Sequence, residues 1–263
     1  MVELTVRRYG EALLEQAEQL VGLLDGADLS RRVPTCPDWD VRQLVEHLGQ
    51  AHRHGAHMVE TRAEGPPDYS GTPRPTLPED PAERVRWLRE GAARVVEAVR
   101  SAGPDEPVWN FSGGDPRAAF WLRRMCHETA VHRADAAIAL DAPYEVAPDV
   151  AADAISEWLS LVTSPGLVAF RPEQAAALRG SGETLHLHAT DSPSLGEAGE
   201  WLIRRGPEAV TWEHGHQKGD VAVRGLAKDL LQVILGRIGT GDSRLQVFGD
   251  PALLDHWVAH ATF

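Results

Sequence analysis

The spacing of apolar residues changes near residue 165, and this change most constrains what the chain can fold into. Before it, apolar residues recur every three or four positions, which is typical of helices that bury one face. After it, several stretches alternate apolar and polar residues, which is typical of strands in a sheet with one buried face. We therefore predict a helical domain over residues 1–165 and a smaller α+β domain over residues 166–263.

The helical part is predicted to be an up-and-down bundle whose helices are separated by loops rich in glycine and proline. Asp40 and Gln43, three positions apart, form a capping box that marks the start of one helix. Pro81 suits the first position of another helix, because its missing N–H costs nothing there. The expected helices cover residues 5–24, 81–101, 116–140 and 149–162, together with one that opens at residue 40.

The second part is predicted to combine short strands with two helices, within the usual size of a domain. Period-two alternation is clearest over residues 184–189, where histidines alternate with leucines. The other expected strands lie within residues 209–214, 221–224 and 245–248, and the expected helices cover residues 225–237 and 251–260.

The charge and the cysteine content exclude several classes of protein. With 26 Lys and Arg against 39 Asp and Glu the net charge is −13, which disfavours binding to nucleic acid or anionic membranes. Two cysteines, Cys36 and Cys126, cannot form a disulfide framework. The sequence shows neither a signal peptide nor an apolar run of about 20 residues that could span a bilayer. We therefore expect a cytoplasmic protein.

A histidine–glutamate motif lies in the helix expected over residues 116–140. His127-Glu128-Thr129-Ala130-Val131-His132 has one residue too many for the HExxH motif of zinc proteases. At about 100° per residue, His127 and His132 lie about 140° apart around the helix and cannot easily share a metal ion. Glu128 and His132 are four positions apart and lie on one face, where they can supply two ligands. A zinc site with an open position needs a third protein ligand from elsewhere in the chain.

His47 is the best candidate for the third ligand, because it lies beside buried positions of the helix that opens at Asp40. Taken singly, His47 could be a hydrogen-bonded core histidine. Glu128 and His132 alone could be an exposed pair on a helix surface. Three such groups on two helices that can face each other favour a divalent-metal site formed by His47, Glu128 and His132.

Further polar residues leave alternatives open. Asp135, three positions after His132, either holds the far nitrogen of that imidazole or pairs with an arginine in solvent. His186 and His188 lie two apart on one predicted strand, and His214 and His216 flank Gly215. Either histidine pair could bind a metal adventitiously, and neither is assigned as a site.

Three stretches that together span the whole chain carry a resemblance to a known family. The first is Thr-Cys-Pro-Asp-Trp-Asp-Val-Arg over residues 35–42, leading to His47, the second is Glu128 with His132 and Asp135, and the third lies within residues 220–250. The first two resemble the mycothiol-dependent maleylpyruvate isomerase family, and the third resembles that family's C-terminal domain. The resemblance implies a DinB-like four-helix bundle followed by a small α/β domain similar to sterol carrier protein 2. It also implies that His47, Glu128 and His132 hold a divalent metal, usually zinc.

The resemblance further implies a reaction that uses mycothiol, a small thiol of actinobacteria. A metal-bound thiol loses its proton, and the thiolate attacks an electrophilic carbon. With maleylpyruvate, addition to the cis double bond allows rotation, and elimination returns the trans isomer. With another electrophile the enzyme would stop after addition, as an S-transferase. The expected partners are a thiol and a small electrophile, without nucleic acid or membrane, for a monomer or homodimer.

Three arginines are candidates for binding an anionic substrate or cosubstrate. Arg224, which the resemblance matches to a family position, is the first choice for a catalytic and cofactor-binding role. Arg84 and Arg86 are second choices, and Arg84 is taken as the second catalytic candidate. A surface salt bridge is the alternative for each. Cys36 and Cys126 are expected to lie outside the chemistry. Two other functions remain open, namely a zinc hydrolase that activates water and a non-catalytic, metal-containing protein that binds a small ligand.

Overall fold

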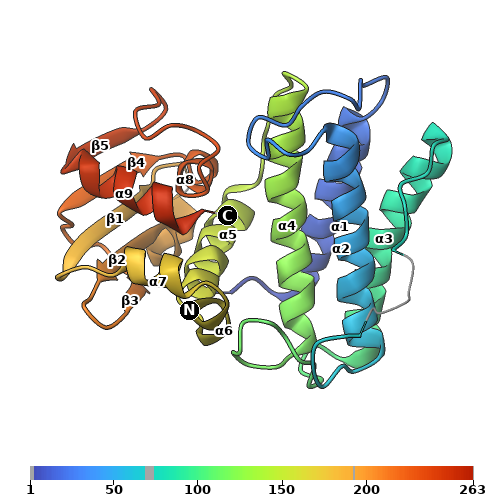
Figure 1. Ribbon diagram of the computed structural model, residues 1–263, viewed down its shortest axis with the longest axis horizontal. Coiled ribbons are helices and arrows are strands. Elements are labelled where there is room, and N and C mark those ends of the chain that lie inside the picture. Colours follow the sequence, from blue (N-terminus) through green and yellow to red (C-terminus); the bar gives the residue numbers. More distant parts are fainter. Residues whose placement is uncertain (1–2, 69–73, 192, 263) are drawn as a thin grey trace. The chain divides into compact units, whose positions relative to one another are not determined.

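The computed structural model describes residues 3–68, 74–191 and 193–262 and divides into two compact units (Figure 1). The bundle unit is Thr5–Tyr144, and the sheet unit is Glu145–Phe263 together with the first four residues. The helical bundle followed by a smaller α+β unit confirms the predicted fold class.

The division lies earlier than the boundary expected at residue 165. The fifth helix, α5 (Pro148–Val162), belongs to the sheet unit, where it packs against helix α8 and the 3₁₀ segment η1. Helix α5 is buried on most of its surface, and its apolar spacing does not reveal which unit buries it.

In the part of the bundle unit that the structure describes, the chain forms four long helices. Helix α2 packs against both α3 and α4, and α1 packs against α4 and α3. The predicted capping box is present: Gln43 N–H donates to Asp40 Oδ1 (2.8 Å), and Asp40 N–H donates to Gln43 Oε1 (3.0 Å). The helices are α1 Val6–Leu23, α2 Val41–Glu60, α3 Pro81–Ala102 and α4 Ala118–Ala139.

Helices α2 and α3 approach closely at Gly49. A Cβ atom at Gly49 would stand 1.7 Å from Cζ3 of the Trp87 ring. Gly49→Ala is therefore expected to lower the free energy of unfolding by about 1–3 kcal/mol, because the indole must move within a packed interface. Gly22→Ala on α1 is the matched control, since a Cβ there meets nothing within 4 Å. It should stabilise the protein by up to about 1 kcal/mol. Urea unfolding of both variants checks the prediction, which is wrong if both shift the same way.

The sheet unit holds a five-stranded sheet, among the described residues, in the order β3-β2-β1-β4-β5. Strands β1 and β4 are parallel, and the other neighbouring pairs are antiparallel. The strands are β1 Glu183–Ala189, β2 Glu200–Arg205, β3 Val210–His214, β4 Val221–Gly225 and β5 Gln246–Gly249. The remaining elements are α6 Pro165–Phe170, α7 Pro172–Leu178, η1 Pro193–Gly199, α8 Ala227–Ile234 and α9 Pro251–Ala261.

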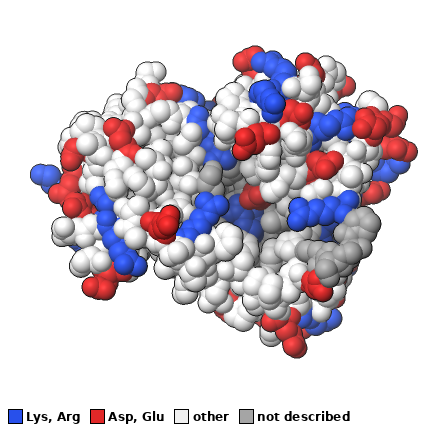
Figure 2. Space-filling view, viewed as in Figure 1, with Lys and Arg blue, Asp and Glu red and all other residues white. Residues whose placement is uncertain are grey.

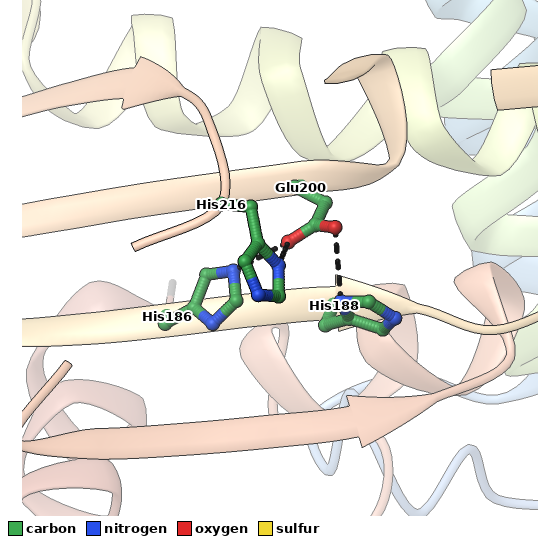
Figure 3. A group of neighbouring side chains, drawn as sticks. All are labelled: His186, His188, Glu200 and His216. Carbon is green, nitrogen blue, oxygen red and sulfur yellow. Dashed lines mark hydrogen bonds and ion pairs between the residues drawn. The ribbon is translucent and has the colours of Figure 1, made fainter. Parts of the chain in front are cut away.

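The two faces of this sheet differ sharply. One face is apolar and contacts helices, with α8 against β1 and β4 and α9 against β4. Its fully buried residues are Leu185, Leu187, Trp201, Ile203, Val221 and Val223. The other side, here called the outer face, carries His186, His188 and Glu200 (Figure 3) together with Arg224. The alternation predicted over residues 184–189 is confirmed.

Strand β2, helices α6 and α7 and the η1 segment were not predicted from the sequence. Acidic and basic side chains are interspersed over both units on the face shown in Figure 2. Within the described residues, no helix combines the length and the apolar character that crossing a bilayer requires.

Candidate metal centre

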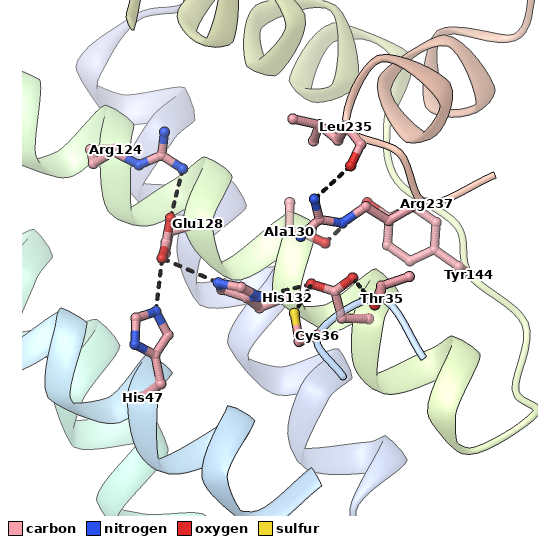
Figure 4. A network of polar contacts seen from close by, with 11 residues as sticks. Thr35, Cys36, His47, Arg124, Glu128, Ala130, His132, Tyr144, Leu235 and Arg237 are labelled. Carbon is pink, nitrogen blue, oxygen red and sulfur yellow. Dashed lines mark hydrogen bonds and ion pairs between the residues drawn. The ribbon is translucent and has the colours of Figure 1, made fainter. Parts of the chain in front are cut away.

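The three predicted metal ligands meet in the bundle unit. His47 comes from α2, and Glu128 and His132 come from one face of α4 (Figure 4). Nε2 of His47 lies 3.0 Å from Oε1 of Glu128, and Nε2 of His132 lies 3.3 Å from the same oxygen. Glu128 and His132 therefore share one face of α4, as their four-residue spacing predicted. The imidazoles of His47 and His132 both turn a nitrogen toward the Glu128 carboxylate.

Asp135 resolves an alternative that the sequence left open. Its Oδ2 lies 2.8 Å from Nδ1 of His132, and its Oδ1 accepts a hydrogen bond from Thr35 Oγ1 (2.6 Å). The Asp135 side chain is completely buried. Asp135 therefore fixes the orientation of the His132 ring and leaves Nε2 facing Glu128, which is the usual arrangement behind a metal-binding histidine.

Arg124 is a residue of this site that the sequence analysis did not identify. One turn before Glu128 on α4, it donates from Nη2 to Glu128 Oε2 (2.8 Å), so the two carboxylate oxygens have different partners. Burial raises the pKa of Glu128, but Arg124, His132 and His47 outweigh it and hold that pKa well below its usual range. Glu128 is therefore a permanent anion at neutral pH.

The residues before α2 form one side of the site. The Trp39 ring lies 4.9 Å from the His47 ring and 6.1 Å from the His132 ring, measured between centroids. The Cys36 sulfur lies 3.9 Å from Asp135 Oδ2. Burial lowers the pKa of His132, but Asp135, Cys36 and Glu128 outweigh it and hold that pKa well above its usual range.

The donor set fits a divalent cation. The ligand atoms of His47, Glu128 and His132 lie within 4.8 Å of one another. Two imidazole nitrogens and one carboxylate oxygen are ligands that zinc accepts with a further position left open. Cys36, His132 and Asp135 form a second group of the same compactness. The group of His47, Glu128 and His132 is the better candidate. In the other group, the two carboxylate oxygens of Asp135 are already hydrogen-bonded, one to Thr35 and one to His132.

His127 is excluded from the site, as the helix geometry predicted. Its side chain is buried, and its ring meets the edge of Tyr9 on α1 at 5.9 Å between centroids. Cys126 is likewise fully buried.

The candidate arginines Arg84 and Arg224 lie in different surroundings. Arg84 donates to the backbone carbonyls of Pro78 (3.3 Å) and Glu79 (2.9 Å), so its guanidinium holds the segment before α3. Arg224 belongs to the sheet unit, is exposed and lines a groove on the outer face. The roles of Arg224 and Arg84 in binding a substrate carboxylate remain predictions.

Asp135→Asn tests the orienting role of this carboxylate. We expect zinc affinity to fall by about 10–100-fold, because the His132 ring loses its charged partner. Competition with a chromophoric chelator measures the affinity. Asp141→Asn is the control, because Asp141 forms an exposed ion pair with Arg31 and such pairs contribute little. Equal zinc affinity in wild type and Asp135→Asn would contradict this role.

Fold and site together define a class: a two-domain protein in which a helical bundle carries a histidine–glutamate cluster. Residues 11–137 match the mycothiol maleylpyruvate isomerase N-terminal domain, and residues 149–256 match the domain described as the MDMPI C-terminal domain. The chain belongs to the mycothiol-dependent maleylpyruvate isomerase family.

Solved structures agree with this assignment at the level of the fold. The crystal structure of the mycothiol-dependent maleylpyruvate isomerase has 15% sequence identity and a TM-score of 0.54, covering 94% of this chain and 95% of that chain. A histidine-to-alanine mutant of that enzyme gives 16% identity and a TM-score of 0.56 over the same shares. No curated protein matches the sequence.

Proposed function

We propose that this protein is a metal-dependent enzyme that uses mycothiol to isomerise or conjugate a small electrophilic substrate. The observation that carries the proposal is the convergence of His47 Nε2 and His132 Nε2 on Glu128 Oε1, within a chain that matches both domains of the family. His47, Glu128 and His132 would hold the cation, for which zinc is our choice.

A bound divalent cation would lower the pKa of a thiol ligand and so supply thiolate at neutral pH. The residues of the chain prepare the site for it. Asp135 holds Nδ1 of His132, which leaves Nε2 directed inward. Arg124 occupies the Oε2 oxygen of Glu128 and leaves Oε1 to the two histidines. His47 is more than a third exposed, which gives a small thiol a route to the cluster.

The thiol and the electrophile are assigned by family membership and by chemistry. Mycothiol is the proposed cosubstrate because the family's N-terminal domain, which residues 11–137 match, carries its name. For a cis-alkene substrate, the thiolate adds to the double bond, the new single bond rotates, and elimination returns both the thiol and the trans product. A substrate from which the thiol is not eliminated would make the protein an S-transferase. A cytoplasmic location completes the proposal.

The hydrolase alternative has less support from the geometry. Activation of water for hydrolysis usually needs a general base beside the open position. Glu128 and Asp135, the carboxylates of the cluster, are held by Arg124 and by Thr35. A non-catalytic protein that binds a small ligand is the remaining alternative.

Thiol-dependent turnover distinguishes these functions. Zinc-loaded protein is assayed with maleylpyruvate and a panel of electrophiles, in the presence of mycothiol, glutathione or cysteine. The proposal predicts turnover with mycothiol and a rise in melting temperature with mycothiol alone among the thiols. Hydrolysis without any thiol would support the hydrolase. The absence of both turnover and thiol binding would overturn the proposal.

A further inference from the structure

A second cluster of metal-ligand side chains lies on the outer face of the sheet unit, and the proposed function does not use it. His186 and His188 alternate with buried leucines along β1 and so point to the same side of the sheet. Glu200 of β2 is the register partner of His188, and Arg224 of β4 is its partner on the other side. One row across three strands therefore carries an imidazole, a carboxylate and a guanidinium.

The connection from β3 to β4 adds the fourth side chain. Strands β2 and β1 separate β3 from β4 in the sheet, so residues 215–220 must cross both of them. Gly215 begins this crossing with a φ of +154°, and Gly219 passes so close that a Cβ there would stand 3.0 Å from the backbone nitrogen of His186. His216 lies within this crossing and reaches the same carboxylate.

Three imidazoles converge on Glu200 (Figure 3). His186 Nε2 and His216 Nδ1 each lie 2.7 Å from Oε2, and His188 Nδ1 lies 3.1 Å from Oε1. All four ligand atoms lie within 4.8 Å of one another. In a tetrahedral zinc site with bonds of about 2.0–2.1 Å, ligand atoms stand about 3.3 Å apart, so movements of about 1 Å would complete the geometry.

We propose that His186, His188, Glu200 and His216 form a second divalent-metal site, separate from the one in the bundle unit. Three imidazoles and one carboxylate suit zinc and neighbouring transition metals far better than calcium or magnesium. His186 and Glu200 are largely buried and hold the base of the site, whereas the side chain of His216 is 75% exposed. His216 is therefore the ligand that closes over an arriving cation.

The site opens into a groove of about 500 Å³ on the outer face. His188, Glu200 and His216 line this groove together with Arg224. The groove gives the cation a path of entry and leaves space for a water molecule or a small anion beside it. Arg224 supplies the positive charge that a carboxylate ligand of the metal would contact there.

Metal stoichiometry tests the proposal without reference to activity. The wild-type protein and its variants are saturated with Zn²⁺ and desalted, and the metal is counted by mass spectrometry. We expect two equivalents in wild type and one in the double variant His188→Ala/His216→Ala. Glu200→Gln, which preserves the size of the side chain, should also hold one. His260→Ala is the control, because His260 Nδ1 lies 2.8 Å from the His256 carbonyl oxygen and His260 belongs to none of the clusters of metal-ligand side chains. This variant should retain two equivalents.

A further variant separates this site from the proposed active site. His47→Ala should lose the zinc ion bound in the bundle unit and keep the zinc ion bound at the site that contains His216. Substituting Co²⁺ for Zn²⁺ in that variant should give the visible absorption of a nitrogen–oxygen-ligated site. Adding His188→Ala/His216→Ala to His47→Ala should abolish this absorption. Equal metal content in wild type and in His188→Ala/His216→Ala would overturn the second site while leaving the bundle site standing.

Discussion

Glu128→Gln is expected to lose its bound metal and at least about 100-fold of the mycothiol-dependent activity. Zinc binding of about 10–16 kcal/mol shared among about four ligands assigns about 2.5–4 kcal/mol to each, or roughly 100–1,000-fold in affinity. Glutamine keeps the shape of Glu128 but not its charge, and Arg124 loses the carboxylate to which it donates. Metal content and kcat/KM at saturating mycothiol measure the two losses.

The matched control is Glu60→Gln on α2. Glu60 also pairs with an arginine, Arg94, on the bundle, but this pair is not part of the cluster of metal-ligand side chains. Its metal content and activity should stay at the wild-type level. A Glu128→Gln protein that binds zinc as tightly as wild type would remove Glu128 from the ligand set.

Acidification from pH 7 to pH 4 is expected to destabilise the bundle unit through His52. This side chain is completely buried on α2, and its Nε2 lies 2.8 Å from Thr129 Oγ1. Its Nδ1 has no hydrogen-bond partner among the described residues. Burial, followed by the charge of Arg53, lowers the pKa of His52 to about 4. Protonation would therefore place an uncompensated charge in the core.

The direction of the effect follows from proton binding in the two states. Above pH 6.5 His52 is neutral in both folded and unfolded chains and contributes no pH dependence. Between about pH 6.5 and pH 4 only the unfolded chain gains the proton, so the free energy of unfolding falls by about 3 kcal/mol. Below pH 4 the contribution levels off.

His52→Gln isolates this contribution from that of the other histidines. Urea unfolding of metal-free protein at several pH values should show a smaller loss of stability on acidification in the variant, by about 3 kcal/mol. Identical pH profiles in the two proteins would show that His52 titrates normally in the folded state.

The clustering of His47, Glu128 and His132 was largely predictable, because these residues follow local helix geometry. Glu128 and His132 share a face at four-residue spacing whatever surrounds them, and the capping box at Asp40 sets the phase of the helix that carries His47. Spacing alone did not decide between Asp135 as a partner of His132 and as a solvent-exposed acid. The burial of Asp135 and its bond to Thr35, 100 positions earlier, decide it.

The second cluster was out of reach of the sequence analysis, because it depends on strand β2. Trp201, Leu202 and Ile203 form a continuous apolar run rather than an alternation, since Leu202 is buried on the outer face as well. A short apolar run does not distinguish a strand from a buried helix. Without β2, Glu200 has no register partner. Nothing in the sequence then indicates that His186 and His188 on β1 lie near His216, which follows β3. Arg124 escaped notice because an arginine four residues before a glutamate is a common surface pairing.

A crystal structure of zinc-loaded protein, with anomalous scattering at the zinc edge, locates the cation itself. We expect a peak within about 2.0–2.2 Å of His47 Nε2, His132 Nε2 and a carboxylate oxygen of Glu128. A peak bonded instead to Cys36 and Asp135, or no peak between α2 and α4, would contradict the assignment of these three ligands.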